Sequence, residues 1–88
     1  MHNKDRKYVY YEDKFGATIG YLNTLNMSED SVMVNIIACK DIRGDGTLAE
    51  WNVNHLGVEI LVDFRTKTKW KFYEDYEEFC ADFVEAIL

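Results

Sequence analysis

Residues 74–88 carry a helical pattern that constrains the fold more than any other stretch of the chain. Large apolar side chains recur there every three or four residues, which places them on one face of an α-helix. They are Tyr76, Phe79, Cys80, Phe83, Val84, Ile87 and Leu88. Asp75 is a suitable N-cap, and Glu78 three residues later completes a capping-box pattern. The segment predicts an amphipathic helix that needs an apolar surface to lie on.

Shorter stretches rich in β-branched and aromatic residues predict the strands that supply this surface. They span residues 7–11, 17–22, 31–39, 51–55, 58–64 and 70–73. Asp45-Gly46 within 41–47 predicts a tight hairpin, 23–30 a loop and 65–69 a basic turn. We therefore expect an α+β fold. It is an antiparallel β-meander of about five to six strands, with one C-terminal amphipathic helix packed on one face.

The stretch 31–39 is apolar on both sides of its predicted strand. Alternation places four side chains on one face, namely Val32, Val34, Ile36 and Ala38. The other face then carries Met33, Ile37 and Cys39. A strand that is apolar on both faces is typical of the centre of a sheet.

The length and composition of the chain favour one small domain over residues 1–88. There is no Pro and little Gly, so no linker divides the 88 residues. The first seven residues are polar and predict no signal peptide, which indicates a cytoplasmic protein. Cys39 and Cys80 lie in apolar stretches without a C-x-x-C motif, so we expect both to be buried and reduced.

The negative charge of the chain is concentrated at its C-terminal end. Residues 1–71 contain all ten Lys and Arg residues and ten of the sixteen acids, so their formal charge is zero. The net charge of −6 therefore comes from six side chains, which we call the C-terminal acids: Glu74, Asp75, Glu77, Glu78, Asp82 and Glu85. Direct nucleic-acid binding needs a basic face, so a basic protein surface is the expected partner.

Two interpretations of the C-terminal acids compete. The helix dipole favours the acids of the first turn, but it does not favour Asp82 or Glu85 near the other end. In one interpretation the acids are solvated, or neutralised by bases of the chain itself: Arg65, Lys67, Lys69 and Lys71. In the other they form a binding surface. Acids four residues apart on a helix are spaced about 6 Å along its axis. That is comparable to the spacing of nucleic-acid phosphates, about 3.4 Å per strand. Such a surface would fit a protein groove that normally holds DNA or RNA.

The segment Tyr73-Glu-Asp-Tyr-Glu-Glu-Phe-Cys-Ala-Asp-Phe83, about one-eighth of the 88 residues, resembles small acidic anti-CRISPR proteins of phages. Some of these Cas9 inhibitors end in a similarly acidic segment punctuated by Phe. The resemblance implies that the chain occupies the DNA-binding site of the nuclease, near where it reads the short motif beside its target. The matching contacts would be Glu74, Asp75, Glu77, Glu78 and Asp82. The chain lacks the early helix of that inhibitor, which departs from the pattern.

Alternatives from other classes stay open. The chain could be a structural or regulatory interaction subunit, or a toxin-immunity protein, that acts through its sheet face, including as a homodimer. Exposed aromatic side chains on a face without a helix would mark such a contact. We expect no enzyme activity, catalytic residue, cofactor or metal site. His2 and His55 have no Cys or acid at ligand spacing, and no Ser lies in a nucleophile motif.

Overall fold

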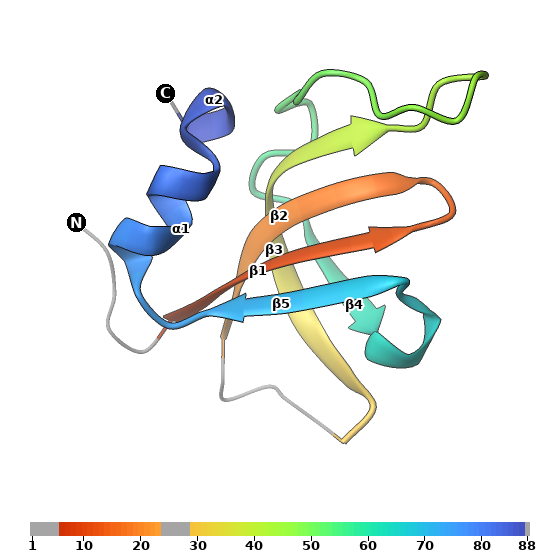
Figure 1. Ribbon diagram of the computed structural model, residues 1–88. Coiled ribbons are helices and arrows are strands. Elements are labelled where there is room, and N and C mark those ends of the chain that lie inside the picture. Colours follow the sequence, from red (N-terminus) through yellow and green to blue (C-terminus); the bar gives the residue numbers. More distant parts are fainter. Residues whose placement is uncertain (1–5, 24–28, 88) are drawn as a thin grey trace.

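The computed structural model describes residues 6–23 and 29–87 of the chain. It contains one five-stranded antiparallel sheet followed by short C-terminal helices, an α+β arrangement (Figure 1). The strands are β1 (Arg6–Asp13), β2 (Gly16–Asn23), β3 (Ser31–Asp41), β4 (Glu59–Asp63) and β5 (Lys69–Tyr73). Their order in the sheet is β4-β3-β2-β1-β5. The first four strands form the predicted meander, but β5 pairs with β1 rather than with β4.

The link between β4 and β5 forces the sheet to curl. Four strand spacings of a flat sheet would separate these two edge strands by about 19 Å. Only residues 64–68 join them, and Phe64–Thr66 of this link form a 3-10 helix, η2, that rises only about 2 Å per residue. The edges must therefore approach each other, as the bent strands in Figure 1 show. The curl encloses an inner cluster of six buried residues: Val9, Tyr11, Leu22, Val32, Val34 and Val62.

A bulge in the pairing of β2 with β3 changes which face β3 presents to the core. Ile19 lies opposite Ala38, but Gly20 lies opposite Ile36, so β3 has one extra residue there. A side chain on Gly20 would not fit, because its Cβ would lie 2.3 Å from the Asn35 carbonyl oxygen. As a result Val34 belongs to the inner cluster and Ala38 to the opposite face. The expectation that these two residues share a face was wrong, because strict alternation takes no account of a bulge.

The other face of the sheet carries a second group of buried residues, the helix-side cluster. Its members are Tyr8, Ile19, Ala38, Tyr73 and Phe79. Phe79 comes from helix α1 (Tyr76–Asp82) and is fully buried against Tyr8 and Tyr73, with ring centroids 4.7 and 5.5 Å away. Both faces of the sheet therefore carry buried residues, although Leu61 of β4 and Phe72 of β5 remain 68% and 39% exposed.

The predicted single helix over 74–88 is divided in two. Helix α1 ends at Asp82, and α2 (Val84–Ile87) follows after Phe83, whose backbone leaves the helical region at φ −125° and ψ 34°. The Phe83 ring lies 5.4 Å from that of Tyr10 and 5.8 Å from that of Trp51, so the break accompanies its packing among these rings. The turn that follows leaves Val84 46% exposed, which removes it from the predicted apolar face.

The predicted N-cap and hairpin are confirmed, whereas one predicted strand is not. The Asp75 side chain accepts a hydrogen bond from the Glu77 backbone N–H, so it is the N-cap of α1 as predicted. The hairpin within 41–47 is also confirmed, with Gly46 at φ +88°. The strand predicted at 51–55 was wrong: residue Asn52 makes only an isolated bridge to Cys39. A turn follows at once, because Gly57 at φ +84° and the exposed residues before it fold the chain back to β4.

Some sequence predictions lie at or beyond the edge of the described residues. Residues 24–28 of the predicted loop and Leu88 lie outside them, and the Ile87 side chain is not described. Cys39 and Cys80 are free thiols, but each is half-buried rather than fully buried. Within the described residues, no helix has the length and apolar character needed to cross a membrane.

Candidate protein-binding surface

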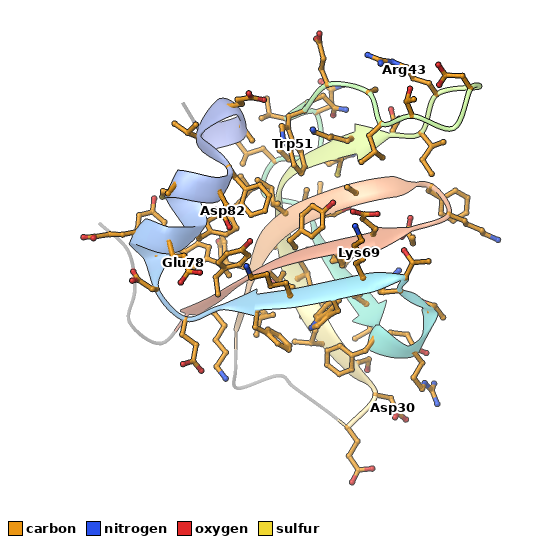
Figure 2. All side chains as sticks on the ribbon, viewed as in Figure 1. Asp30, Arg43, Trp51, Lys69, Glu78 and Asp82 are labelled. Atoms are coloured by element: carbon orange, nitrogen blue, oxygen red, sulfur yellow. The ribbon has the colours of Figure 1, made fainter. Side chains whose placement is uncertain are left out.

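The C-terminal acids are all exposed, but the structure does not treat them alike. Two of them have defined partners within the fold. The Asp75 carboxylate caps α1. The Asp82 carboxylate accepts a hydrogen bond of 2.8 Å from the Tyr73 hydroxyl and lies 3.9 Å from the Lys71 ammonium. Figure 2 shows Asp82 on the side of α1 that faces the sheet.

The contact with Asp82 perturbs the tyrosine. Burial of Tyr73, followed by its hydrogen bond to Asp82 and the negative charges of Asp82 and Glu78, raises the pKa of the Tyr73 hydroxyl to about 12. Each of these effects disfavours the tyrosinate, because a second negative charge would lie beside a carboxylate in a poorly solvated position. Asp82 is therefore an internal contact of the fold as well as a member of the acidic surface.

The other four C-terminal acids have weak partners or none. Glu74 lies 3.7 Å from the Lys7 ammonium, and its side chain is 82% exposed, so this ion pair is strongly screened by solvent. In the described parts of the chain, 6–23 and 29–87, Glu77, Glu78 and Glu85 have no ion pair within 4 Å and no side-chain hydrogen bond. These three carboxylates, which we call the free acids, are available to an outside cation.

The bases that could have neutralised the C-terminal acids are used elsewhere. The Arg65 guanidinium lies 2.8 Å from Asp63 and 3.6 Å from Asp30. Lys67 and Lys69 reach toward the other end of β1, where their ammonium groups lie 3.2 Å from Asp13 and 3.5 Å from Glu12. Of the four bases at 65–71, only Lys71 approaches a C-terminal acid. Internal neutralisation by residues 65–71 therefore applies to Asp82 alone.

The pairing of β5 with β1 explains this division. Lys69 lies opposite Glu12 in the sheet, and Lys71 lies opposite Tyr10. Cross-strand neighbours on one face interact directly, so the sheet register gives Lys69 an acid from β1 before any helix residue can reach it. The register was not predictable from the basic run at 65–71 alone, because the sequence did not indicate that β5 joins β1.

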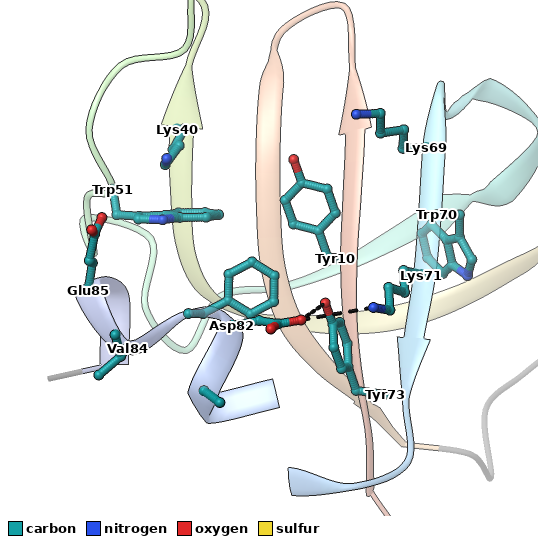
Figure 3. Close-up of a pocket in the computed structure, with 12 residues that line it drawn as sticks. Tyr10, Lys40, Trp51, Lys69, Trp70, Lys71, Tyr73, Asp82, Val84 and Glu85 are labelled. Atoms are coloured by element: carbon teal, nitrogen blue, oxygen red, sulfur yellow. Dashed lines mark hydrogen bonds and ion pairs between the residues drawn. The ribbon is translucent and has the colours of Figure 1, made fainter. Parts of the chain in front are cut away.

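A cleft beside the helices is the feature that the sequence did not predict. It has a volume of about 930 Å³ and lies between β1, β5, α1, α2 and the segment around Trp51 (Figure 3). Its lining residues are Tyr10, Lys40, Trp51, Lys69, Trp70, Lys71, Tyr73, Ala81, Asp82, Phe83, Val84 and Glu85. The residues come from five separate parts of the chain, which meet only because of the strand order. Lys69, Lys71 and Tyr73 alternate along one strand, and this spacing was the only signal in the sequence.

The described residues show no group of three His, Cys, Asp or Glu side chains that could hold a metal ion. Comparisons of the chain with protein-family models, with curated proteins and with solved structures give no match. The functional interpretation therefore rests on the chemistry of the surface.

Proposed function

We propose that this chain is a small acidic protein that inhibits a nucleic-acid-binding protein by occupying its basic groove. The observation that supports the proposal is the set of three free acids, Glu77, Glu78 and Glu85, on a segment that contains no Lys or Arg. The preceding bases Arg65, Lys67 and Lys69 pair with other acids of the fold. A groove built to bind phosphates presents Lys and Arg side chains at a spacing that carboxylates on a helix can match. The partner class that the anti-CRISPR resemblance implies is an RNA-guided nuclease such as Cas9.

The apolar side of the C-terminal segment has a supporting role in this proposal. We infer that α1 and α2 act as one amphipathic unit on the helix-side face of the sheet, with Phe79 and Phe83 as anchors. A segment fixed in this way presents its acids without a further loss of conformational entropy on binding. Partner contacts would come from the free acids first, then from Glu74. Asp75 and Asp82 would contribute charge while keeping their internal contacts.

Competition with DNA tests the proposal. A labelled target duplex is bound to a Cas9–guide complex, and fluorescence anisotropy follows its release as the chain is added. We expect the wild-type chain to displace the duplex and the Glu78→Lys/Glu85→Lys variant to do so far less well, because each substitution places a cation against the cations of the groove. The control Glu29→Lys/Asp41→Lys makes the same change in net charge at exposed sites outside the C-terminal segment.

Two results would count against groove occupation. Equal loss in both variants would show that net charge alone governs the effect. Displacement that does not weaken as salt rises would show that the contact is not electrostatic. No displacement of the duplex at all would reject Cas9 as the partner.

One observation supports a second candidate, an interaction subunit. Each face of the sheet has a buried cluster, but β4 is an edge strand, and its Leu61 side chain is 68% exposed. Exposed edge strands pair readily with other chains. A homodimer or a toxin-immunity contact would therefore form along β4, and sedimentation of the Leu61→Lys variant as a monomer, against a wild-type dimer, would support it.

A further inference from the structure

The cleft beside the helices combines two kinds of side chain that are found together in small-ligand sites. Its floor is aromatic: the Tyr10 and Phe83 rings are stacked with centroids 5.4 Å apart, and the Trp51 ring meets Phe83 edge-on at 88°. Three ammonium groups lie around it, from Lys40, Lys69 and Lys71. Figure 3 shows Lys40 beside Trp51 on one side, Lys69 and Lys71 on the other, and Tyr10 between them.

The three lysines are held loosely enough to turn to a ligand. Lys69 lies 3.5 Å from Glu12, and Lys71 lies 3.9 Å from Asp82, which are both longer than a hydrogen bond between charged groups. Both lysine side chains are more than half exposed. Lys40 has no carboxylate within 4 Å among the described residues, and its ammonium lies 4.8 Å from the centre of the Trp51 ring.

The acids near the cleft limit what it can bind. Asp82 and Glu85 also line it, so the three lysines exceed the lining acids by one charge. Glu12 is occupied, because the Tyr10 hydroxyl donates a hydrogen bond to it and Lys69 lies beside it. A long polyanion would also have to pass Glu77 and Glu78 on the neighbouring helix, whereas a small anion with one charged group would meet only the two acids of the cleft itself.

We propose that this cleft binds a nucleotide-sized aromatic phosphate, a flat ring system that carries one phosphate group. The ring would stack on the aromatic floor and the phosphate would lie between Lys40 and Lys69, since a flat π-system stacks on aromatic side chains and ammonium groups are good phosphate partners. The volume of about 930 Å³ falls in the range of small-molecule sites, about 300–1,000 Å³. The rings and lysines that would hold the ligand are not among the free acids, although Glu85 also lines the cleft, so this site and the proposed inhibitory surface meet only at Glu85.

Nuclear magnetic resonance with adenosine monophosphate as the probe tests the proposal. The chain has two tryptophans, so its spectrum has two indole N–H signals, which the Trp70→Phe variant assigns. Trp70 is among the residues at the edge of the cleft, but its ring packs against the inner cluster, in contact with the rings of Tyr11 and Phe64, so its indole signal serves as the internal reference. We expect the Trp51 signal to move and saturate at millimolar probe, about 1 mM, while the Trp70 signal stays in place.

The controls separate the two chemical requirements. Adenosine lacks the charge and inorganic phosphate lacks the ring, and each should bind about tenfold more weakly or worse. The Lys40→Ala/Lys69→Ala variant should lose about tenfold in affinity, whereas Lys14→Ala, in the exposed β1–β2 turn, should change it less than about twofold. An unchanged backbone spectrum of each variant shows that it is folded.

Three outcomes would overturn the proposal. They are no movement of the Trp51 signal up to about 10 mM probe, equal movement of both indole signals, and equal affinity of the Lys14→Ala and Lys40→Ala/Lys69→Ala variants.

Discussion

Glu12 and Asp13, at the C-terminal end of β1, have the same chemistry as the free acids of the C-terminal segment but different surroundings. Asp13 accepts hydrogen bonds from the Phe15 and Gly16 backbone N–H groups and lies 3.2 Å from the Lys67 ammonium. Glu78 and Glu85 have no such contacts among the described residues. The bases of 65–71 are far closer in the sequence to the free acids than to Glu12 and Asp13, but the pairing of β5 with β1 directs Lys67 and Lys69 to the β1 acids.

This difference shows that a charge run acquires its role from the fold rather than from its composition. The Arg65 side chain lowers the pKa of the Asp63 carboxyl to about 2, first through the side-chain hydrogen bond between the two and then through the Arg65 backbone N–H. A local contact of this kind closes the η2 turn and uses one of the bases that could have neutralised the helices. The acids left over are those without a base at a neighbouring register position.

The largest effect on the free energy of unfolding is expected at Phe79, the apolar anchor of the C-terminal segment. Phe79→Ala removes a fully buried ring that contacts Tyr8 and Tyr73, and should lower the free energy of unfolding by about 3–5 kcal/mol. Val84→Ala, at a position 46% exposed, should cost well under about 1 kcal/mol. Urea denaturation measures both. Similar losses at the two positions would mean that the segment is not anchored through Phe79.

The next largest effect is expected at Tyr73, the β5 residue whose hydroxyl donates a hydrogen bond to Asp82. The pKa of Tyr73 is raised to about 12, so between pH 10 and pH 12 the unfolded chain releases the Tyr73 proton while the folded chain keeps it. The contribution of the protonated Tyr73 to the free energy of unfolding is therefore complete below pH 10. It is lost as the pH rises toward 12, which lowers the free energy of unfolding by on the order of 2 kcal/mol. Urea midpoints at pH 9 and pH 12 should fall further for the wild type than for Tyr73→Phe. Parallel losses would place the titration elsewhere.

A smaller loss of stability is expected at Asp13, an acid that has partners within the fold. Asp13→Ala leaves two backbone N–H groups of the β1–β2 turn and the Lys67 ammonium without their acceptor, and should cost about 1–2 kcal/mol. Glu29→Ala, at an exposed position, is the matched control and should stay within about 0.5 kcal/mol. Thermal denaturation of the two variants side by side decides the matter. If Asp13→Ala costs no more stability than Glu29→Ala, the contacts of Asp13 do not stabilise the fold, and the two groups of acids do not differ in this respect.

Much of the fold could be predicted from periodicity, and the failures have local physical causes. The strands and the Asp75 cap followed from side-chain pattern, because alternation and capping are properties of neighbouring residues. The division of the helix at Phe83, and the placement of Ala38 opposite the inner cluster, depend on tertiary packing and on a bulge. The 51–55 stretch alternates like a strand, but the turn that ends at Gly57 leaves it only one bridge.

The candidate site was predictable in part. The C-terminal acids stand out in the sequence because no base lies among them, and all of them are exposed as a binding surface requires. Which of them are free could not be predicted, because that depends on the pairing of β5 with β1. The cleft was not predictable either, since Lys40 and Trp51 reach it from a strand and a loop whose positions follow from the curl of the sheet.

The most direct test of the account is the free energy of unfolding of the Glu78→Gln/Glu85→Gln variant, measured by urea denaturation at neutral pH and low salt. If these carboxylates have no internal partner, removing their charges should leave the stability within about 0.5 kcal/mol of the wild type, or raise it slightly by relieving repulsion. A loss of more than about 1 kcal/mol would contradict the account, because it would show that the fold itself uses the charges assigned to a partner.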